Sequence, residues 1–147
     1  MKQIIFLSAI FLFTLNACGP SMDETTNNQT PSTSQPGEYF PSPADSVLMR
    51  SKAFVEEASL LTLESYPLQF SLHISGSLPT PCHNLRVAVS PPNSENKVVV
   101  DAYSVADPDV ICAQVLAPFD VTIPLGSFPT GKYTLWVNGE IIAEFQT

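Results

Sequence analysis

Apolar and polar residues alternate in the second half of the chain, and this alternation predicts β-strands. The clearest case runs from Tyr66 to Leu78, where nearly every second residue is apolar. Side chains of a strand point to opposite faces in turn, so the pattern predicts a strand with one face in a core. The apolar face holds Leu68, Phe70, Leu72 and Ile74, and the polar face holds Gln69, Ser71, His73 and Ser75.

Shorter apolar segments between clusters of Pro, Gly and Asn predict further strands. They are Leu85–Val89, Lys97–Val105, Val110–Leu116, Phe119–Leu125, Tyr133–Val137 and Ile141–Phe145. In Phe119–Leu125 every second residue is again apolar. Short strands separated by turn residues predict an all-β fold, a two-sheet β-sandwich of about seven strands.

The start of the sandwich is ambiguous in the sequence. The segment from Ala44 to Ala58 has apolar residues near helical spacing, but Phe54-Val55 also fits a strand. Prolines at 41, 43 and 67 bracket the segment, and β-elements dominate the rest of the chain. We therefore favour a strand from about Phe54.

Asn138-Gly139 predicts a hairpin between the last two strands. A two-residue turn would pair Val137 with Glu140, and a three-residue loop would pair it with Ile141. A slip of one residue exchanges the two faces, so we treat the registers as exclusive. The three-residue loop gathers the apolar residues on one face, and we predict it, with Leu135 opposite Ala143 and Tyr133 opposite Phe145. It leaves Trp136 largely exposed on the outer face, as a candidate contact surface.

The amino terminus has the pattern of an export signal. Lys2 is followed by an apolar run from Ile4 to Leu15, about a dozen residues, whereas a membrane-spanning helix needs roughly twenty. The run therefore has the size of the apolar region of a secretory signal peptide.

The next residues, Leu15-Asn16-Ala17-Cys18, resemble the lipobox of bacterial lipoproteins. The resemblance implies removal of residues 1–17 as a lipoprotein signal peptide and a diacylglyceryl thioether on Cys18. Two or more acyl chains give stable membrane anchoring. In lipoproteins of bacteria with two membranes, an Asp directly after the Cys resembles an inner-membrane retention signal. This chain has Gly19 at that position instead. The implied location is the cell envelope, anchored to a membrane outside the cytoplasm, and the outer membrane if the cell has one.

The region after Cys18 is rich in Ser, Thr, Asn, Gln and Pro and has no apolar period. Such a composition cannot bury enough surface to offset the cost of ordering. We expect residues 18–50 to form a lipid-anchored disordered linker, with Tyr39-Phe40 as an exposed aromatic pair, and residues 51–147 to form the sandwich domain.

Cys82 and Cys112 form an even pair in an exported domain, which predicts a disulfide. Closing a loop of about 30 residues would stabilise the domain by roughly 3–4 kcal/mol in the chain-entropy model. The competing hypothesis is a metal site of both cysteines with His73 and His83. It is less favoured, because C-x-x-C and H-x-x-x-H spacings are absent and thiols oxidise outside the cytoplasm.

The chain is acidic, with six Lys and Arg against fourteen Asp and Glu and a formal net charge of −8. Such a body repels nucleic-acid phosphates and anionic lipid head groups, so we expect no nucleic-acid partner. Membrane contact is expected through the lipid on Cys18, and we expect the protein to be a monomer.

Candidate catalytic residues are few. With two histidines, no G-x-S-x-G and no free cysteine expected, nucleophilic catalysis has little to work with. We interpret His73 as a solvated strand residue and His83 as orienting nothing. Asp107-Pro108-Asp109 is better explained as a turn than as part of a calcium loop, and Glu56-Glu57 with Glu64 is weak evidence for a glycosidase pair. We expect no cofactor and no metal.

Two further segments carry resemblances. Gly131–Gly139 resembles the end of many exported immunoglobulin-like modules, which implies an immunoglobulin-like sandwich. Residues 78–83 together with 124–128 resemble uncharacterised bacterial lipoproteins, which supports the anchor and the fold only.

The function that these features favour is a lipid-anchored extracytoplasmic non-catalytic binding or accessory module, with a protein or glycan ligand of unknown identity. The alternative is an enzyme or enzyme inhibitor of the cell envelope. A cleft lined by His73, Asp101 and Asp120 would favour that alternative.

Overall fold

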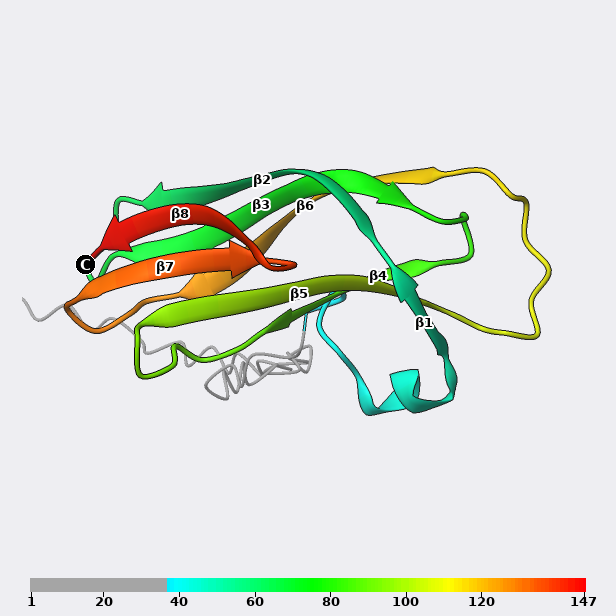
Figure 1. Ribbon diagram of the computed structural model, residues 1–147, viewed down its shortest axis with the longest axis horizontal. Coiled ribbons are helices and arrows are strands. Elements are labelled where there is room, and N and C mark those ends of the chain that lie inside the picture. The colour runs from blue at the N-terminus through cyan, green and yellow to red at the C-terminus, as the bar shows by residue number, and fades with distance from the viewer. Residues whose placement is uncertain (1–36) are drawn as a thin grey trace, which may run out of the picture. The chain divides into compact units, whose positions relative to one another are not determined.

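Eight β-strands and one short helix make up residues 37–147, the part of the chain that this computed structural model describes (Figure 1). The 3-10 helix η1 spans Pro43–Val47, and the strands are β1 Met49–Lys52, β2 Phe54–Leu63, β3 Gln69–Leu78, β4 Asn84–Val89, β5 Lys97–Ala106, β6 Ala117–Gly126, β7 Lys132–Val137 and β8 Glu140–Gln146. No helix of these residues is long and apolar enough to cross a membrane. The predicted signal peptide, Cys18 and the first part of the predicted linker lie outside the described residues.

Strand β5 is the centre of a five-stranded sheet, because three other strands pair with it. Strand β4 runs antiparallel along one edge, opposite residues 100–105. The other edge is divided between two strands: β7 pairs in parallel with residues 97–100, and β1 pairs antiparallel with residues 103–106. Strand β8 then extends the sheet beyond β7.

Asn138 closes the gap that this division leaves beside Ala102. Its carboxamide oxygen accepts a hydrogen bond from the Ala102 N–H at 2.8 Å, and its Nδ2 donates to the Ala102 carbonyl at 3.0 Å. Its own N–H donates to the carbonyl of Val100. The side chain thus takes the place of a strand residue between β7 and β1. Asn138 has a φ of 48°, in the left-handed region that Asn tolerates better than most residues.

The second sheet has three antiparallel strands in the order β2-β3-β6. Phe70, Leu72 and Ile74 of β3 are buried, so the apolar face predicted for this strand is confirmed. Leu68 precedes the strand and is exposed. On β6 the predicted apolar face also lies inward, with Ile123 buried and its apolar neighbours packed against the core.

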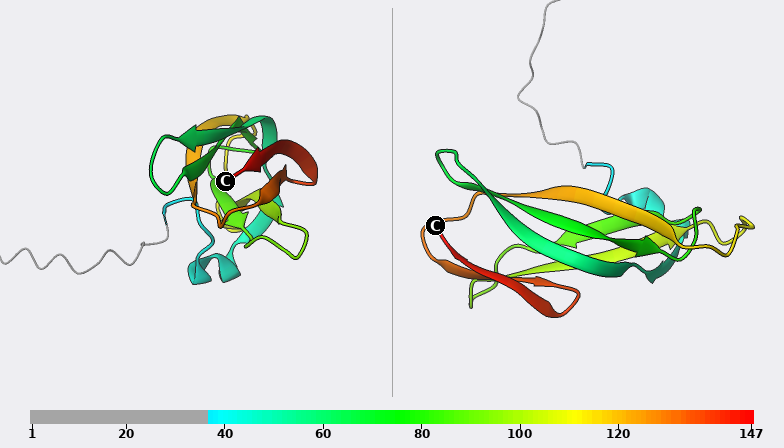
Figure 2. Two further views of the ribbon diagram at one scale, coloured as in Figure 1. Left: turned by 90° about the vertical axis from the view of Figure 1, so that its left-hand side faces the viewer. Right: turned by 90° about the horizontal axis from the view of Figure 1, so that it is seen from above.

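The two sheets pack face to face and enclose one core, which confirms the predicted two-sheet β-sandwich (Figure 2). The five-stranded sheet contributes buried residues from β4, β5 and β7, and the other sheet contributes mainly β3 and Ile123. Four aromatic rings, with centroids 4.7 to 5.8 Å apart, form a cluster within the sandwich: Phe70, Phe128, Tyr133 and Phe145.

The packed structure begins earlier in the chain than the predicted boundary at residue 51. Tyr39 and Phe40, predicted as an exposed pair, instead pack against the core, and the Tyr39 carbonyl accepts a hydrogen bond from the Val87 N–H at 2.7 Å. Helix η1 and the start of β1 also fall within the predicted linker. The predicted strand from about Phe54 is confirmed as β2.

The strand predicted at Val110–Leu116 is wrong, because residues 107–116 form a loop between β5 and β6. Its apolar side chains face solvent instead of the core. A run of apolar residues is therefore not enough to predict a strand, because this segment has no neighbouring strand to pair with.

The closing hairpin has both registers that we treated as exclusive. Asn138 and Gly139 have φ values of 48° and 92° and form a two-residue turn, so the predicted three-residue loop is wrong. Val137 pairs with Glu140 beside the turn, but a bulge between Leu135 and Trp136 leaves Ile142 unpaired. Beyond the bulge, Leu135 pairs with Ala143 and Tyr133 with Phe145, as predicted. The extra residue returns the apolar side chains to one face.

Gly76 of β3 lies against the backbone of β2 with no room for a side chain. A Cβ atom at this position would lie 2.0 Å from the Phe54 carbonyl oxygen, so the backbone of β2 would have to move. We expect Gly76→Ala to lower the free energy of unfolding by about 3 kcal/mol, as for other overpacked sites. Ser75→Ala, on the outer face of the same strand, should change it by less than about 0.5 kcal/mol. Urea unfolding measures both, and equal stabilities would contradict the close approach.

Candidate contact surface on the five-stranded sheet

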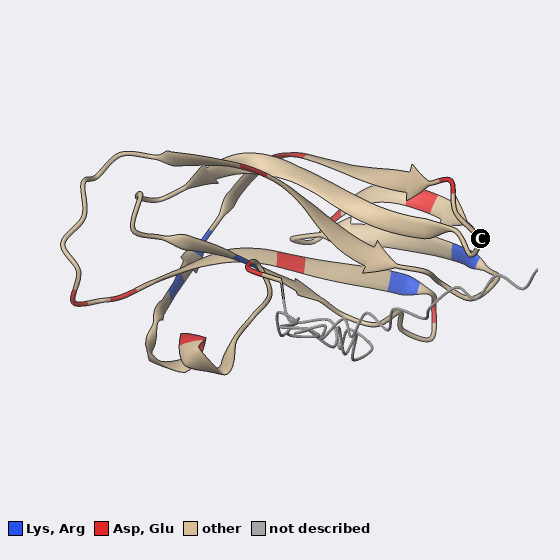
Figure 3. Ribbon diagram, turned by 180° about the vertical axis from the view of Figure 1, so that it is seen from behind, with Lys and Arg blue, Asp and Glu red and all other residues tan. Residues whose placement is uncertain are grey.

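Every Lys and Arg of residues 37–147 lies in the five-stranded sheet (Figure 3). The chain has six such residues, and without Lys2 five remain: Arg50, Lys52, Arg86, Lys97 and Lys132. Their side chains lie on the face turned away from the core, which we call the outer face. The strands of the other sheet contain no Lys or Arg and carry Glu56, Glu57 and Asp120. The two sheets therefore differ in charge.

A shallow hollow of about 730 Å³ lies on the outer face, over the gap between β1 and β7. Arg50 and Lys52 line it from β1, Asp101 and Tyr103 from β5, and Asn138 from the hairpin turn. The division of the β5 edge thus produces the hollow, since neither β1 nor β7 covers this part of β5. It offers two cations, an aromatic ring and backbone polar groups to a ligand.

Arg50 is held at the hollow by two contacts. Its guanidinium carbon lies 3.6 Å from the centroid of the Tyr103 ring, and its Nη2 forms an ion pair with Asp101 Oδ2. About half of each charged side chain remains exposed. A guanidinium stacked on a ring keeps free N–H donors in a planar arrangement that matches a carboxylate or a phosphate.

Trp136 lies on the same outer face, but it is half-buried instead of largely exposed as predicted. The Lys97 ammonium nitrogen lies 3.5 Å from the centroid of its ring, and its Nε1 donates to Thr134 Oγ1 at 3.2 Å. The neighbouring strand supplies this cover, because Val99 of β5 pairs with Trp136. The Trp136 ring is thus partly covered by its neighbours on β5. The hollow is the part of the outer face that remains open to a ligand.

Arg86 and Asp45 form the most buried ion pair of the described residues. Arg86 Nε donates to Asp45 Oδ2 at 2.8 Å and Nη2 donates to Oδ1 at 3.0 Å, with 16% and 12% of the side chains exposed. The pair fixes helix η1 against β4. Because the Arg86 guanidinium is bound to Asp45, it is not free to bind a ligand. The Arg86 hydrogen bond, followed by that from the Ser42 N–H, lowers the pKa of Asp45 below its usual value of 3.8.

The predicted catalytic candidates are not brought together. His73 Nε2 lies 3.0 Å from Asp120 Oδ1 on the outer face of the three-stranded sheet, whereas Asp101 is on the other sheet with Arg50. His73 is 27% exposed, so the interpretation as a solvated strand residue is only partly right.

The acidic candidates have local partners. Asp107 Oδ1 accepts from the Asp109 N–H at 2.9 Å, which fits the predicted turn. Glu56 accepts from Ser77 Oγ at 3.0 Å. Within residues 37–147, no group of three or more His, Cys, Asp and Glu residues is placed to hold a metal ion.

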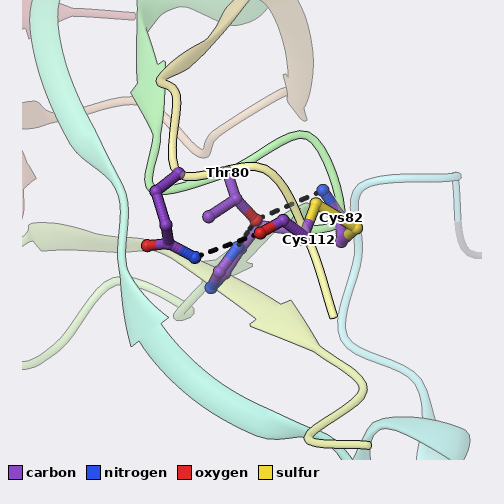
Figure 4. The surroundings of a disulfide bond; sticks show 5 residues. Thr80, Cys82 and Cys112 are labelled. Atoms are coloured by element: carbon purple, nitrogen blue, oxygen red, sulfur yellow. Dashed lines mark hydrogen bonds between the residues drawn. A yellow bond between two sulfur atoms is a disulfide. The ribbon is translucent and has the colours of Figure 1, made fainter. Parts of the chain in front are cut away.

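Cys82 and Cys112 lie at disulfide-bonding distance, with their Cα atoms 6.0 Å apart (Figure 4). The bond joins the β3–β4 turn to the β5–β6 loop. His83, predicted to orient nothing, has its Nδ1 2.8 Å from Thr80 Oγ1, and this oxygen accepts from the Cys82 N–H. The prediction for His83 is therefore wrong, because His83 helps to fix the turn that carries Cys82.

The sequence contains little sign of the hollow. The cations are few, but Arg50 and Lys52 flank the polar residue Ser51, so alternation does not place these two cations on the outer face of a strand. The side-chain contact of Arg50 with the Tyr103 ring could not be read from the sequence either, because it depends on the register of β1 against β5.

The ion pair of Asp45 predicts a pH dependence of stability. A carboxyl with a lowered folded pKa stabilises the fold above its unfolded value and loses this contribution as the pH falls through the folded pKa. We expect Asp45→Asn to be less stable than the parent protein at pH 5 to 7, and the difference to disappear well below pH 3.8. Thermal unfolding of both proteins across this range measures it. A difference that does not change with pH would show that the charge of Asp45 is not involved.

Comparison with known proteins places the chain in a family. No curated protein and no solved structure matches it. A family model described as the ORF11 beta-sandwich domain matches residues 72–147, from the middle of β3 to the end of the chain. The match covers half of the chain and agrees with the two-sheet architecture. The chain therefore belongs to the ORF11 beta-sandwich domain family.

Proposed function

We propose that this protein is a lipid-anchored, extracytoplasmic, non-catalytic binding module whose contact surface is the outer face of the five-stranded sheet. The hollow between β1 and β7 is the centre of this surface, and its ligand carries carboxylate or similar anionic groups. The observation that carries the proposal is the position of Arg50 and Lys52 beside Tyr103 in the hollow.

The anchor is supported by the sequence. A short cationic start, an apolar run too short to span a bilayer, and Leu15-Asn16-Ala17-Cys18 follow one another in the order of a lipoprotein signal. The Cys82–Cys112 pair supports an oxidising compartment outside the cytoplasm. Lipidated Cys18 would hold the sandwich in the cell envelope, on the outer membrane if the cell has one.

The binding role is supported by the chemistry of the hollow. Lys52 is exposed, and its ammonium nitrogen lies 5.9 Å from the centroid of the Phe54 ring. Arg50 can exchange the carboxylate of Asp101 for that of a ligand without leaving the Tyr103 ring. Since the rest of the chain is acidic, long-range repulsion directs an anionic ligand toward this face and away from the three-stranded sheet.

Replacing Cys18 by Ser tests the anchor. Without the thiol no thioether can form, so we expect the variant to move from the membrane fraction to the soluble exported fraction. Fractionation of cells that produce either form, with a high-salt wash that removes ionic contacts and with Cys82→Ser as a control that keeps Cys18, measures the change. A Cys18→Ser variant that still sediments with membranes after the wash would contradict lipidation at this residue.

Removing the two cations of the hollow tests the contact surface. We expect the exported Cys18→Ser protein to bind isolated cell envelopes. Arg50→Ala/Lys52→Ala in that background should bind at least about tenfold more weakly, since charged hydrogen bonds contribute about 1.5–3 kcal/mol each. Lys132→Ala removes a cation from the same face outside the hollow and should have little effect.

Co-sedimentation over a range of protein concentrations measures the three affinities. An equal loss in both cation variants would indicate general charge attraction, and unchanged binding in the double variant would exclude the hollow as the contact.

A further inference from the structure

We infer that the loop of residues 107–116, which we call the β5–β6 loop, is a second interaction surface that docks into an apolar pocket with a basic rim on a partner protein. This surface is separate from the hollow on the outer face and does not depend on it.

The β5–β6 loop exposes four large apolar side chains. Ile111 is fully exposed, and Val110, Val115 and Leu116 are 52%, 57% and 63% exposed. Burying a Val, Leu or Ile side chain is worth about 1.5–3 kcal/mol, so these four residues forgo a large stabilisation in the isolated domain. Four exposed apolar side chains in one short loop are typical of an interaction site.

The loop is fixed rather than free to fold back onto the core. Cys112 at its centre is joined to Cys82 of the β3–β4 turn (Figure 4). The Val110 N–H donates to the Asp107 carbonyl at 3.3 Å, and the Val115 N–H donates to the Ala113 carbonyl at 3.0 Å. These bonds restrict the backbone on both sides of Ile111, which lowers the entropic cost of binding.

The charge of the loop identifies the rim of the partner. Asp107 and Asp109 are exposed at its start, and the chain has no Lys or Arg between Lys97 and Lys132. An apolar tip with two carboxylates beside it is complementary to an apolar pocket with Lys or Arg at its edge. The same carboxylates oppose insertion among anionic lipid head groups, because no cation of the loop compensates them.

Site-specific photocrosslinking of the full chain in living cells tests the inference. A benzophenone amino acid at Ile111 should give an adduct with one identifiable protein. The same amino acid at Ile141, an apolar residue that is 56% exposed on the closing hairpin, should not give it. An adduct with lipid alone, with a second copy of this chain, or equally from both positions would overturn the inference.

The captured protein, once purified, allows a quantitative test with the intact Cys18→Ser chain. Ile111→Asp should weaken binding at least tenfold, and Asp107→Asn/Asp109→Asn should reduce the dependence of the affinity on NaCl. Both changes lie on exposed side chains, and circular dichroism checks that the fold is kept. Arg50→Ala/Lys52→Ala should leave this affinity unchanged, which separates this surface from the hollow. An Ile111→Asp variant that binds as well as the parent protein would refute the docking loop.

Discussion

Strand β5 needs hydrogen-bond partners on both edges over ten residues, and the rest of the sandwich depends on how this is done. One edge is covered by β4, but the other is shared by a parallel strand, β7, and an antiparallel strand, β1. Two strands that meet end to end leave a backbone segment unpaired, and a buried polar group without a partner costs about 1–3 kcal/mol. The carboxamide of Asn138 supplies the missing donor and acceptor for Ala102, so a hairpin turn completes the sheet.

The same arrangement creates the candidate contact surface. Because neither β7 nor β1 pairs with the edge of β5 at residues 101–102, a hollow forms there, and Asn138 lines only its edge. Strand β1 brings Arg50 and Lys52 to this hollow, and β5 brings Tyr103. The fold thus concentrates the few cations of an acidic chain on one face, while the β5–β6 loop carries exposed apolar side chains at one end. The cations and the exposed apolar loop are separated on the molecule, which is consistent with two distinct kinds of contact.

The sequence predicted those parts of the fold that depend on alternation along a single strand. The buried faces of β3 and β6 were found because every second residue there enters the core. Strand β1 was missed because its four residues are held by pairing with β5 and by side-chain contacts on the outer face, with little burial. The segment around Ile111 was misassigned because exposed and buried apolar residues are identical in the sequence. The prediction for the hairpin was right in the pairing away from the turn and wrong in the turn itself. Alternation indicates that the apolar side chains share one face, but it does not show that a two-residue turn followed by a bulge achieves this. The contact of Arg50 with Tyr103 joins residues far apart in the chain, so only the register between strands brings it into view.

Amide hydrogen exchange at Ala102 tests most directly whether Asn138 completes the sheet. Exchange is slow where the N–H is hydrogen-bonded and opening is rare. If the carboxamide completes the sheet, the Ala102 amide is as well protected as its neighbours on β5. Asn138→Gly, which keeps the turn conformation but removes the carboxamide, then selectively removes this protection while Val98 stays protected. Rapid exchange of Ala102 in the parent protein, or unchanged protection in Asn138→Gly, would contradict this role of Asn138.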